Sequence, residues 1–337
     1  MSNQSELIWQ DPEWLKQAND WIQIETKRQS IRITGTIEQP HVYPWSTVLH
    51  VPTSEGILFF KATAPQTLYE AVLTQSLATW YPDCMPELVA VDTARGWMLM
   101  RDGGEMLRAS IRPKKDLAPW SPVIARYSAL QLDLANHLPE LLALSVPDFR
   151  LAALPELYTE LMADEERLQL EQPNGLSSKE VAHLRGMGSR FEQICGDLAA
   201  YEIPESLNHG DFHDGNVLLR DGRIMLFDWG DANVTHPFVS LRTFFVSIEI
   251  SLKLDDYSFT PEMAKLLDLY LQPWQRFSAK EDLLIAFGIS KCVASIVTAL
   301  KWREAIIHLK APLREKYTGI VPELMREFLY YEKMISA

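Results

Sequence analysis

The sequence is poor in cysteine. Its 337 residues include only Cys84, Cys195 and Cys292, which lie far apart and form no C-x-x-C pair. An odd number of widely spaced cysteines argues against a disulfide framework, and the missing pair argues against a zinc site built on that motif. The chain therefore fits a reducing compartment.

The chain also lacks an excess of basic residues. Lys and Arg number 32 against 45 Asp and Glu, which gives a formal net charge of −13. Binding to nucleic acid requires clustered cations that displace counterions from the phosphates. We therefore expect no nucleic-acid partner, and we attribute the acidity to solubility rather than to a cationic ligand.

Signals for export and for membrane insertion are missing as well. The first residues, MSNQSELIWQDPEW, show no basic segment followed by an apolar one, which is the pattern of a secretory signal. The most apolar stretch, residues 283–300, has Lys291 at its middle, and a charge at that depth is costly in a bilayer. We expect a buried core helix there, and a cytoplasmic protein without a membrane partner.

What the sequence does contain is an ordinary globular composition, with 47% hydrophobic and 23% charged residues. Its length suffices for two structural units. The first hundred residues favour a small antiparallel sheet with turns at prolines and glycines. The expected helices are 11–27 and 67–80, and the expected strands are 30–37, 46–51, 57–61, 87–91 and 97–101.

From about residue 120 the pattern of apolar residues becomes mainly helical. A short insert interrupts it, because two apolar runs flank Asp221-Gly222, which predicts a β-hairpin over 217–228. The expected helices are 121–138, 155–170, 178–200, 239–254, 261–271, 279–308 and 321–335.

The hairpin lies inside a polar segment, residues 207–231, that reads LNHGDFHDGNVLLRDGRIMLFDWGD. Asn216 stands at the entry of the hairpin and Asp228 at its exit, so the two can converge in space. Asp211 lies five residues before Asn216. Asn and Asp supply the hard oxygen ligands that Mg²⁺ prefers, and a nearby carboxylate can orient an acceptor hydroxyl and take its proton. The pattern favours phosphoryl transfer over a merely turn-rich segment.

This segment resembles the aminoglycoside phosphotransferase and choline kinase-like family, which is related to protein kinases. The family's first element, His-Gly-Asp followed by His and Asn, is matched at His209, Gly210, Asp211, His213 and Asn216. Its second element is matched at Phe227, Asp228, Trp229, Gly230 and Asp231. The resemblance implies that Asp211 is the catalytic base, that Asn216 and Asp228 bind Mg²⁺, and that the phosphoryl donor is ATP.

The resemblance further implies a bilobal kinase-like α+β fold. Residues 1–101 would form the nucleotide-binding lobe and residues 102–337 the mostly helical catalytic and substrate-binding lobe. Lys61, at the end of the third strand, would bind the α- and β-phosphates, and Glu70 would hold it. Backbone groups near Met100 would bind adenine. Taken alone, Lys61 reads as a surface lysine and Glu70 as half of a capping box with Thr67.

Two features depart from the family pattern. The turn expected over the phosphates, residues 38–46, contains no glycine, so no phosphate loop is assigned there. After the metal site, Ser240 stands before Leu241 where the family often carries an acidic residue. We expect the second change to alter local anchoring and to leave the phosphate chemistry intact.

Other functions fit less well. Gly210-Asp211-Phe212-His213 also resembles one element of binuclear metallophosphoesterases, but their later histidine motifs are missing. A catalytically silent nucleotide-binding pseudokinase or interaction module is the main alternative, although Asp211, Asn216 and Asp228 are all retained. A protein acceptor is disfavoured because no Ala-Pro-Glu anchor follows Trp229. We therefore predict a kinase for a hydroxyl of a small molecule, which could be aminoglycoside-, choline- or sugar-like. Its oligomeric state is left open.

Overall fold

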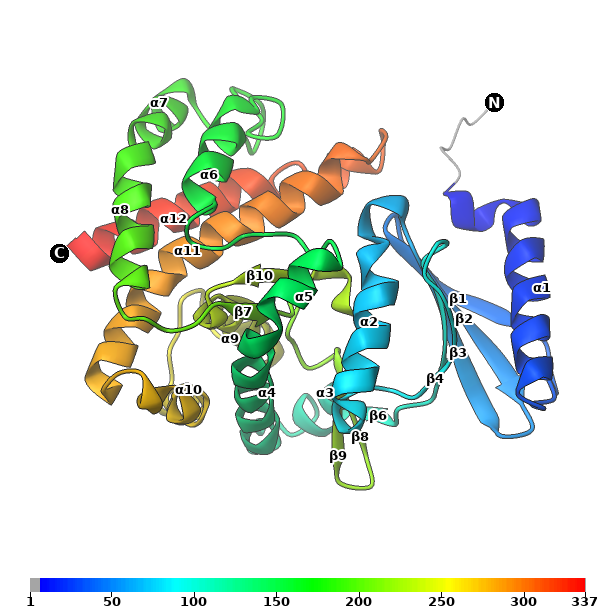
Figure 1. Ribbon diagram of the computed structural model, residues 1–337. Coiled ribbons are helices and arrows are strands. Elements are labelled where there is room, and N and C mark those ends of the chain that lie inside the picture. Colours follow the sequence, from blue (N-terminus) through cyan, green and yellow to red (C-terminus); the bar gives the residue numbers. More distant parts are fainter. Residues whose placement is uncertain (1–6, 337) are drawn as a thin grey trace. The chain divides into compact units, whose positions relative to one another are not determined.

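The structure is a computed structural model that describes residues 7–336 (Figure 1). The chain divides into two compact units. The first contains the residues up to Ala109 together with Asp214–Gly230, and the second contains Ser110–His213 and the residues from Asp231 onward. The predicted α+β class is confirmed. The lobe boundary between residues 101 and 102 stays a prediction, and contacts group the predicted hairpin with the first unit.

The first unit is built on a five-stranded antiparallel sheet with the strand order β1-β2-β3-β5-β4. Side chains of β2 alternate between buried and partly exposed, as the two faces of a sheet require. Helix α1 (Pro12–Arg28) begins after Asp11, whose side chain accepts a hydrogen bond from the Glu13 amide. The strands are β1 (Glu38–Val42), β2 (Ser46–Thr53), β3 (Gly56–Thr63), β4 (Leu88–Asp92) and β5 (Trp97–Arg101).

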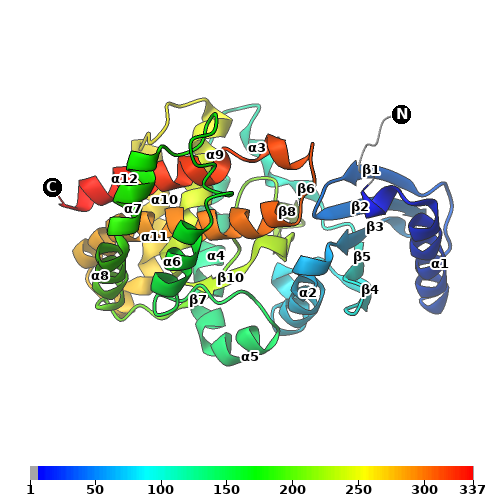
Figure 2. The same ribbon diagram turned by 90° about the horizontal axis from the view of Figure 1, so that it is seen from above.

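The two faces of this sheet carry different chemistry. On the face covered by α1, the ring of Phe60 packs edge-on against Trp21 and Trp97, with ring centroids 5.7 and 5.6 Å away. Because neighbouring residues of a strand point to opposite faces, Lys61 points away from this apolar core. The opposite face is that of α2 (Tyr69–Trp80), as Figure 1 and Figure 2 show.

The predicted hairpin forms the second sheet of the first unit. Its strands are β8 (Val217–Arg220) and β9 (Arg223–Leu226), and β6 (Glu105–Met106) pairs with β8 on the other side. Asp221 and Gly222 form the turn with φ of 50° and 77°, the left-handed conformation that a tight two-residue hairpin turn needs. Asp and Gly tolerate it, so the turn chemistry of the sequence decides this element.

The second unit is mostly helical, with the short antiparallel pair β7 (Ser206–Asn208) and β10 (Asn233–Thr235). Its helices are α4 (Trp120–Leu134), α5 (Leu138–Ala143), α6 (Leu154–Ala163), α7 (Ser178–Gly186), α8 (Gly188–Ala199), α9 (Ser240–Leu252), α10 (Pro261–Leu271), α11 (Lys280–Ile307) and α12 (Ile320–Ser336), and α3 (Leu107–Ile111) spans the chain's passage from the first unit.

Helix α11 contains the apolar stretch noted in the sequence. By length and composition it is the one helix among the described residues that could cross a membrane. In the structure 67% of its most apolar window is buried, and residues 292–300 are all buried. The helix therefore serves as a core helix, as predicted.

Several predicted boundaries were wrong. The strand expected over 30–37 is reduced to one bridge between Ile33 and Thr53, and the first strand is Glu38–Val42 instead. That strand contains Pro40, which is tolerated because β1 is an edge strand. The helix expected over 155–170 ends at Ala163, and the one expected over 178–200 is divided at Met187, between two glycines that weaken a helix.

Candidate active site

Lys61 is held by two carboxylates within the first unit. Its side chain is only 7% exposed, and its ammonium contacts both Glu70 and Asp228. Burial by itself would lower the pKa of Lys61, but the two negative charges and their hydrogen bonds outweigh it and raise the pKa above its ordinary value. The contact expected between Lys61 and Glu70 is therefore present, and Lys61 stays charged on the face of the sheet that α2 covers.

Glu70 does not act as part of a capping box. The N-cap of α2 is Leu68, which has no polar side chain to offer, and Thr67 belongs to the preceding turn. The carboxylate of Glu70 turns inward, where only 3% of its side chain is exposed. The structure thus corrects the capping-box interpretation, because pairing with a buried ammonium outweighs a cap at the exposed start of a helix.

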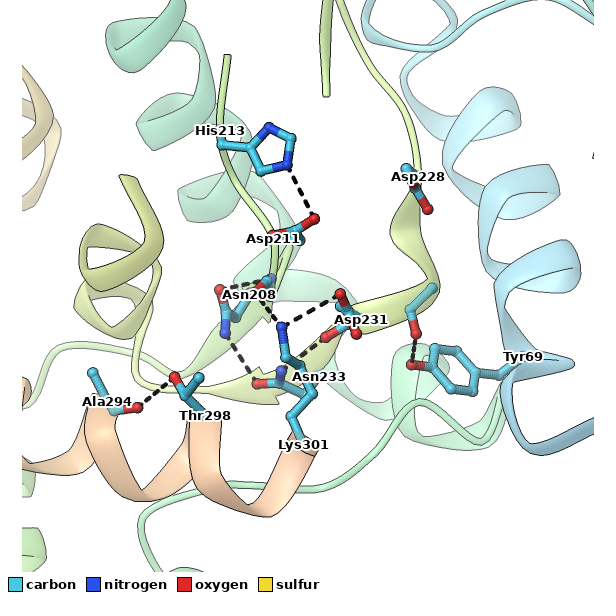
Figure 3. Close-up of polar contacts among 12 residues, drawn as sticks. Tyr69, Asn208, Asp211, His213, Asp228, Asp231, Asn233, Ala294, Thr298 and Lys301 are labelled. Carbon is cyan, nitrogen blue, oxygen red and sulfur yellow. Dashed lines mark hydrogen bonds and ion pairs between the residues drawn. The ribbon is translucent and has the colours of Figure 1, made fainter. Parts of the chain in front are cut away.

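The exit of the hairpin is fixed against α2. The Tyr69 hydroxyl donates to the Gly230 carbonyl at 2.6 Å (Figure 3). A side chain at position 230 would place its Cβ 2.9 Å from the Glu70 carboxylate, so glycine permits this close approach. Asp228 itself has a φ of 67°, an unusual backbone conformation for a residue other than glycine. Such outliers cluster at functional sites.

Asn216 and Asp228 lie at the two ends of the hairpin, as predicted. Val217 pairs with Leu226, and the amide of Phe227 donates to the carbonyl of Asn216 at 3.3 Å. Asn216 is thus beside the residue that precedes Asp228. The register brings the two backbones together, while convergence of their side-chain oxygens on one ion stays a prediction.

The donor set fits Mg²⁺ better than a transition metal. Within residues 7–336, no three His, Cys, Asp or Glu side chains gather into a cluster that could hold a metal ion. One amide oxygen and one carboxylate are nevertheless what a magnesium ion takes from a protein when phosphates and water supply its other ligands. Asn216 and Asp228 are the residues that would hold it.

Asp211 belongs to the second unit, in the loop after β7. The Nε2 atom of His213 lies 3.2 Å from the Asp211 carboxylate, which is one-third exposed (Figure 3). Burial would raise the pKa of Asp211, but the hydrogen bond from His213 and the charges of Lys301, His213 and His209 outweigh it and lower the pKa. Asp211 is therefore ionised at neutral pH, the state that a proton acceptor requires.

A buried polar network anchors the Asp211 loop. Tyr127 accepts a hydrogen bond from the His209 amide at 3.1 Å, and its hydroxyl lies 2.8 Å from that of Ser240. Ser240 donates to the side chain of Asn208 at 2.7 Å, and that same Asn208 oxygen accepts from the Gly210 amide. Ser240 thus takes part in anchoring the loop, at the position where the family often has an acid.

The sequence reasoning missed Tyr127 and Lys301 altogether. Lys301, on α11, contacts the Gly210 carbonyl and the Asp231 carboxylate (Figure 3). Neither residue lies near the motif in sequence, so no spacing could reveal it. Asn208 and Asn233 were visible inside or just after the polar segment, and their side chains bond to each other at 3.2 Å.

Met100 lies on β5, opposite Phe59 of β3 and Leu88 of β4. The strand ends at Arg101, and the following Asp102 side chain accepts from the Gly104 amide at 2.9 Å. Gly104 has a φ of 108°, and a Cβ there would lie 2.3 Å from the Leu219 carbonyl. A glycine is required at this position, where the chain turns after β5. Nucleotide contacts of Met100 stay a prediction.

A cavity of about 520 Å³ lies within the second unit, between α9, α11 and α12. Aromatic and aliphatic side chains make up about half of its wall, and seven of the lining residues are charged. Lys291 is in this wall, and its ammonium lies over three rings, 4.9 Å from the centroid of Phe287 and 5.3 Å from that of Tyr331 among them. Thr298 and Trp302, further along α11, also line the cavity and flank Lys301.

Residues 85–242 match the model of the phosphotransferase enzyme family. The match, which spans a little less than half of the chain, bears out the resemblance that the sequence predicted. The matched range contains Met100, Asp211, Asn216 and Asp228, and it excludes Lys61 and Glu70. The prediction of a phosphotransferase is confirmed at the level of the family. No curated protein matches the sequence significantly.

Solved structures of similar fold align with nearly the whole chain. A choline kinase from Cryptosporidium parvum has a TM-score of 0.65 at 14% identity, with 95% of this chain and 96% of that chain covered. An ethanolamine kinase from Plasmodium vivax has 0.64 at 13%, covering 96% and 89%. A putative aminoglycoside phosphotransferase from Ralstonia eutropha has 0.56 at 13%, covering 94% and 98%. These likenesses confirm the kinase-like fold.

Proposed function

We propose that this protein is an ATP- and Mg²⁺-dependent kinase that phosphorylates a hydroxyl group of a small molecule. The observation that carries the proposal is the pairing of buried Lys61 with both Glu70 and Asp228. A lysine is costly to bury, and a single carboxylate would neutralise it. Its second partner lies 167 residues away, in the motif that the family model matches.

Each residue of the proposed site has a distinct role. Lys61 supplies a positive charge for the nucleotide phosphates, and Glu70 keeps its ammonium in place before the nucleotide arrives. Asn216 and Asp228 would hold Mg²⁺, which neutralises charge on the phosphates when bound. Backbone groups near Met100 would contact adenine.

Asp211 is proposed to act on the acceptor. Its ionised carboxylate can accept a hydrogen bond from the acceptor hydroxyl, orient its oxygen and take its proton as the phosphoryl group is transferred. The hydrogen bond from His213 fixes the carboxylate's orientation. Because phosphoryl transfer demands little covalent chemistry from the protein, such positioning is the main contribution expected of these residues.

The cavity of the second unit is our candidate for the acceptor pocket. Its wall residues Thr298 and Trp302 flank Lys301, which in turn contacts the loop that carries Asp211. A cavity of this size, in which apolar walls carry charged groups that can orient a ligand, is consistent with a small-molecule site. The solved structures of similar fold include a choline kinase and an ethanolamine kinase, so amino alcohols are the first acceptors to test.

A screen of ATP consumption tests the proposal. Wild-type protein is incubated with ATP, Mg²⁺ and a panel of amino alcohols, sugars and aminoglycosides, and Asp211→Asn is run in parallel. We expect one class of acceptor to stimulate ADP formation, and the variant to lose roughly 10²–10⁴-fold in rate because the proton acceptor is gone. A variant at the wild-type rate would reject Asp211 as the base.

The same screen, together with a measurement of ATP binding, distinguishes a kinase from the alternative function. Binding of ATP without turnover on any acceptor would favour a nucleotide-binding pseudokinase. We place the enzyme in the cytoplasm, since its three cysteines are buried thiols, and we expect neither nucleic acid nor membrane as a partner.

A further inference from the structure

Lys301 lies at the end of the apolar core of α11, immediately after nine buried residues. Its side chain is 16% exposed. A lysine at such a place commonly extends its ammonium to solvent. Here the ammonium turns inward instead, donating to the Gly210 carbonyl at 3.1 Å and lying 3.3 Å from the Asp231 carboxylate (Figure 3).

The two partners of Lys301 belong to different segments. Gly210 precedes Asp211 in the loop after β7, and Asp231 begins the segment that leads into β10. Residues 214–230, between them, belong to the first unit. Lys301 therefore joins the segment that leaves the second unit to the segment that returns to it.

Backbone geometry shows how tightly these segments meet. Gly210 has a φ of 76°, and a Cβ there would lie 2.0 Å from the Asp231 carbonyl. Beside them Asn208 pairs with Asn233 across β7 and β10, and the Asn233 side chain donates to the Asp231 carbonyl at 3.1 Å. Lys301, which reaches these segments from α11, adds a positive charge to this group of contacts.

We propose that Lys301 is a positioning residue for the proposed base: by holding Gly210 and Asp231 together it fixes the backbone of Asp211, and its ammonium adds positive charge near the carboxylate. The inference rests on the proposed function. His213 and His209 face Asp211 from its own loop, Lys301 faces it from α11, and each of the three lowers its pKa. Asp231, the acidic neighbour, is paired with Lys301 itself.

Three substitutions test this role. Lys301→Met keeps most of the length of the side chain without charge or donor, Lys301→Gln keeps a donor without charge, and Lys301→Arg keeps both charge and donor. With the acceptor found in the screen, we expect Met and Gln to lose about 10²-fold in kcat, the order of effect of a small displacement of a reacting group. We expect Arg to recover most of the rate, and KM for ATP to change by less than about threefold in all variants.

A pH profile separates charge from mere folding. Without the Lys301 charge the pKa of Asp211 rises. As the pH is lowered, the kcat of the Met variant should therefore begin to fall at a higher pH than that of wild type, because the base is protonated earlier. Lys280→Met is the matched control, because Lys280 lies on the same helix and pairs on the surface with Asp268. It should retain the wild-type rate.

The outcomes distinguish this inference from the proposed function. If wild type turns over and Asp211→Asn does not, a Met variant with wild-type kcat and an unmoved pH profile overturns the role of Lys301 alone. Loss of rate in all three Lys301 variants with equal loss of thermal stability also overturns it, since the residue would then be only structural. Absence of turnover in the wild type overturns both.

Discussion

At the scale of single residues, the most informative feature is a charge balance centred on Lys61. One ammonium faces two carboxylates, and the side chain of Asp228 is 46% exposed while that of Glu70 is 3% exposed. Lys61 is therefore the counter-ion of a buried carboxylate at Glu70, whereas Asp228 remains accessible to another cation. The difference in exposure fits a structural role for Glu70 and the proposed role of Asp228 as a metal ligand, with both carboxylates paired to Lys61.

Replacing Lys61 should affect nucleotide binding and stability separately. We expect Lys61→Met to weaken ATP binding roughly 10- to 100-fold, because a charge-assisted hydrogen bond contributes about 1.5–3 kcal/mol. The single variant should also lose stability, since Glu70 is left buried without its cation. Calorimetric titration with ATP and thermal unfolding measure the two effects.

A double variant, Lys61→Met with Glu70→Gln, completes that test. It should regain much of the lost stability, because no carboxylate remains to be buried, and it should not regain ATP binding. Lys27→Met, at the exposed end of α1, is the control. Unchanged ATP affinity in the Lys61 variant would show that the nucleotide phosphates are bound elsewhere.

At the scale of elements, α9 carries a carboxylate whose environment opposes its charge. Burial raises the pKa of Glu249 to about 7, with Asp256 and Glu327 adding to the shift and Arg242 and Lys291 opposing it. The folded state therefore holds a proton that the unfolded state releases near pH 4.5. The contribution of Glu249 to stability should therefore fall as the pH rises from about 4.5 to 7 and then level off.

Glu249→Gln should remove this dependence. Below pH 4.5 both side chains are neutral, so the variant and wild type should unfold at similar temperatures. At pH 8 we expect the variant to have a Tm higher by about 2–4 °C, which corresponds to about 1 kcal/mol after allowance for solvent screening at this partly exposed site. Calorimetry at both pH values measures the difference. A variant that is less stable at pH 8 would mean that the carboxylate has an essential partner.

At the scale of the whole molecule, the proposed magnesium site should link ligand binding to unfolding. A ligand that binds only the folded state stabilises it by about 2.7 kcal/mol at a concentration 100 times its Kd. A non-hydrolysable ATP analogue should therefore raise the Tm of wild type, and more in Mg²⁺ than in EDTA. We expect Asn216→Ala and Asp228→Asn to abolish the part of this increase in Tm that depends on Mg²⁺.

The hairpin between these residues offers a matched control. Asp221→Asn makes the same chemical change as Asp228→Asn at the exposed turn, where Asn tolerates the left-handed backbone. It should retain the full response to Mg²⁺. A response to Mg²⁺ that survives in both Asn216 and Asp228 variants would rule out these residues as the metal ligands.

The sequence by itself determined the local elements and the chemistry of the polar segment. Asp221-Gly222 dictates the hairpin turn, and the hairpin in turn sets Asn216 beside the residue before Asp228. The candidate residues Asp211, Asn216 and Asp228 were found because they lie within one short motif. Strand and helix types held where periodicity was strong. They failed at Glu38–Val42, where a proline on an edge strand conceals the pairing.

Only the tertiary structure decided which distant side chains meet. Glu70 could be half of a helix cap or the partner of Lys61, and packing of α2 on the sheet settled the choice. Lys301 meets Gly210 across 91 residues, and Tyr127 meets Ser240 across 113. Such contacts depend on how helices pack, and packing is set by the summed fit of many side chains. No local spacing in the sequence records that sum.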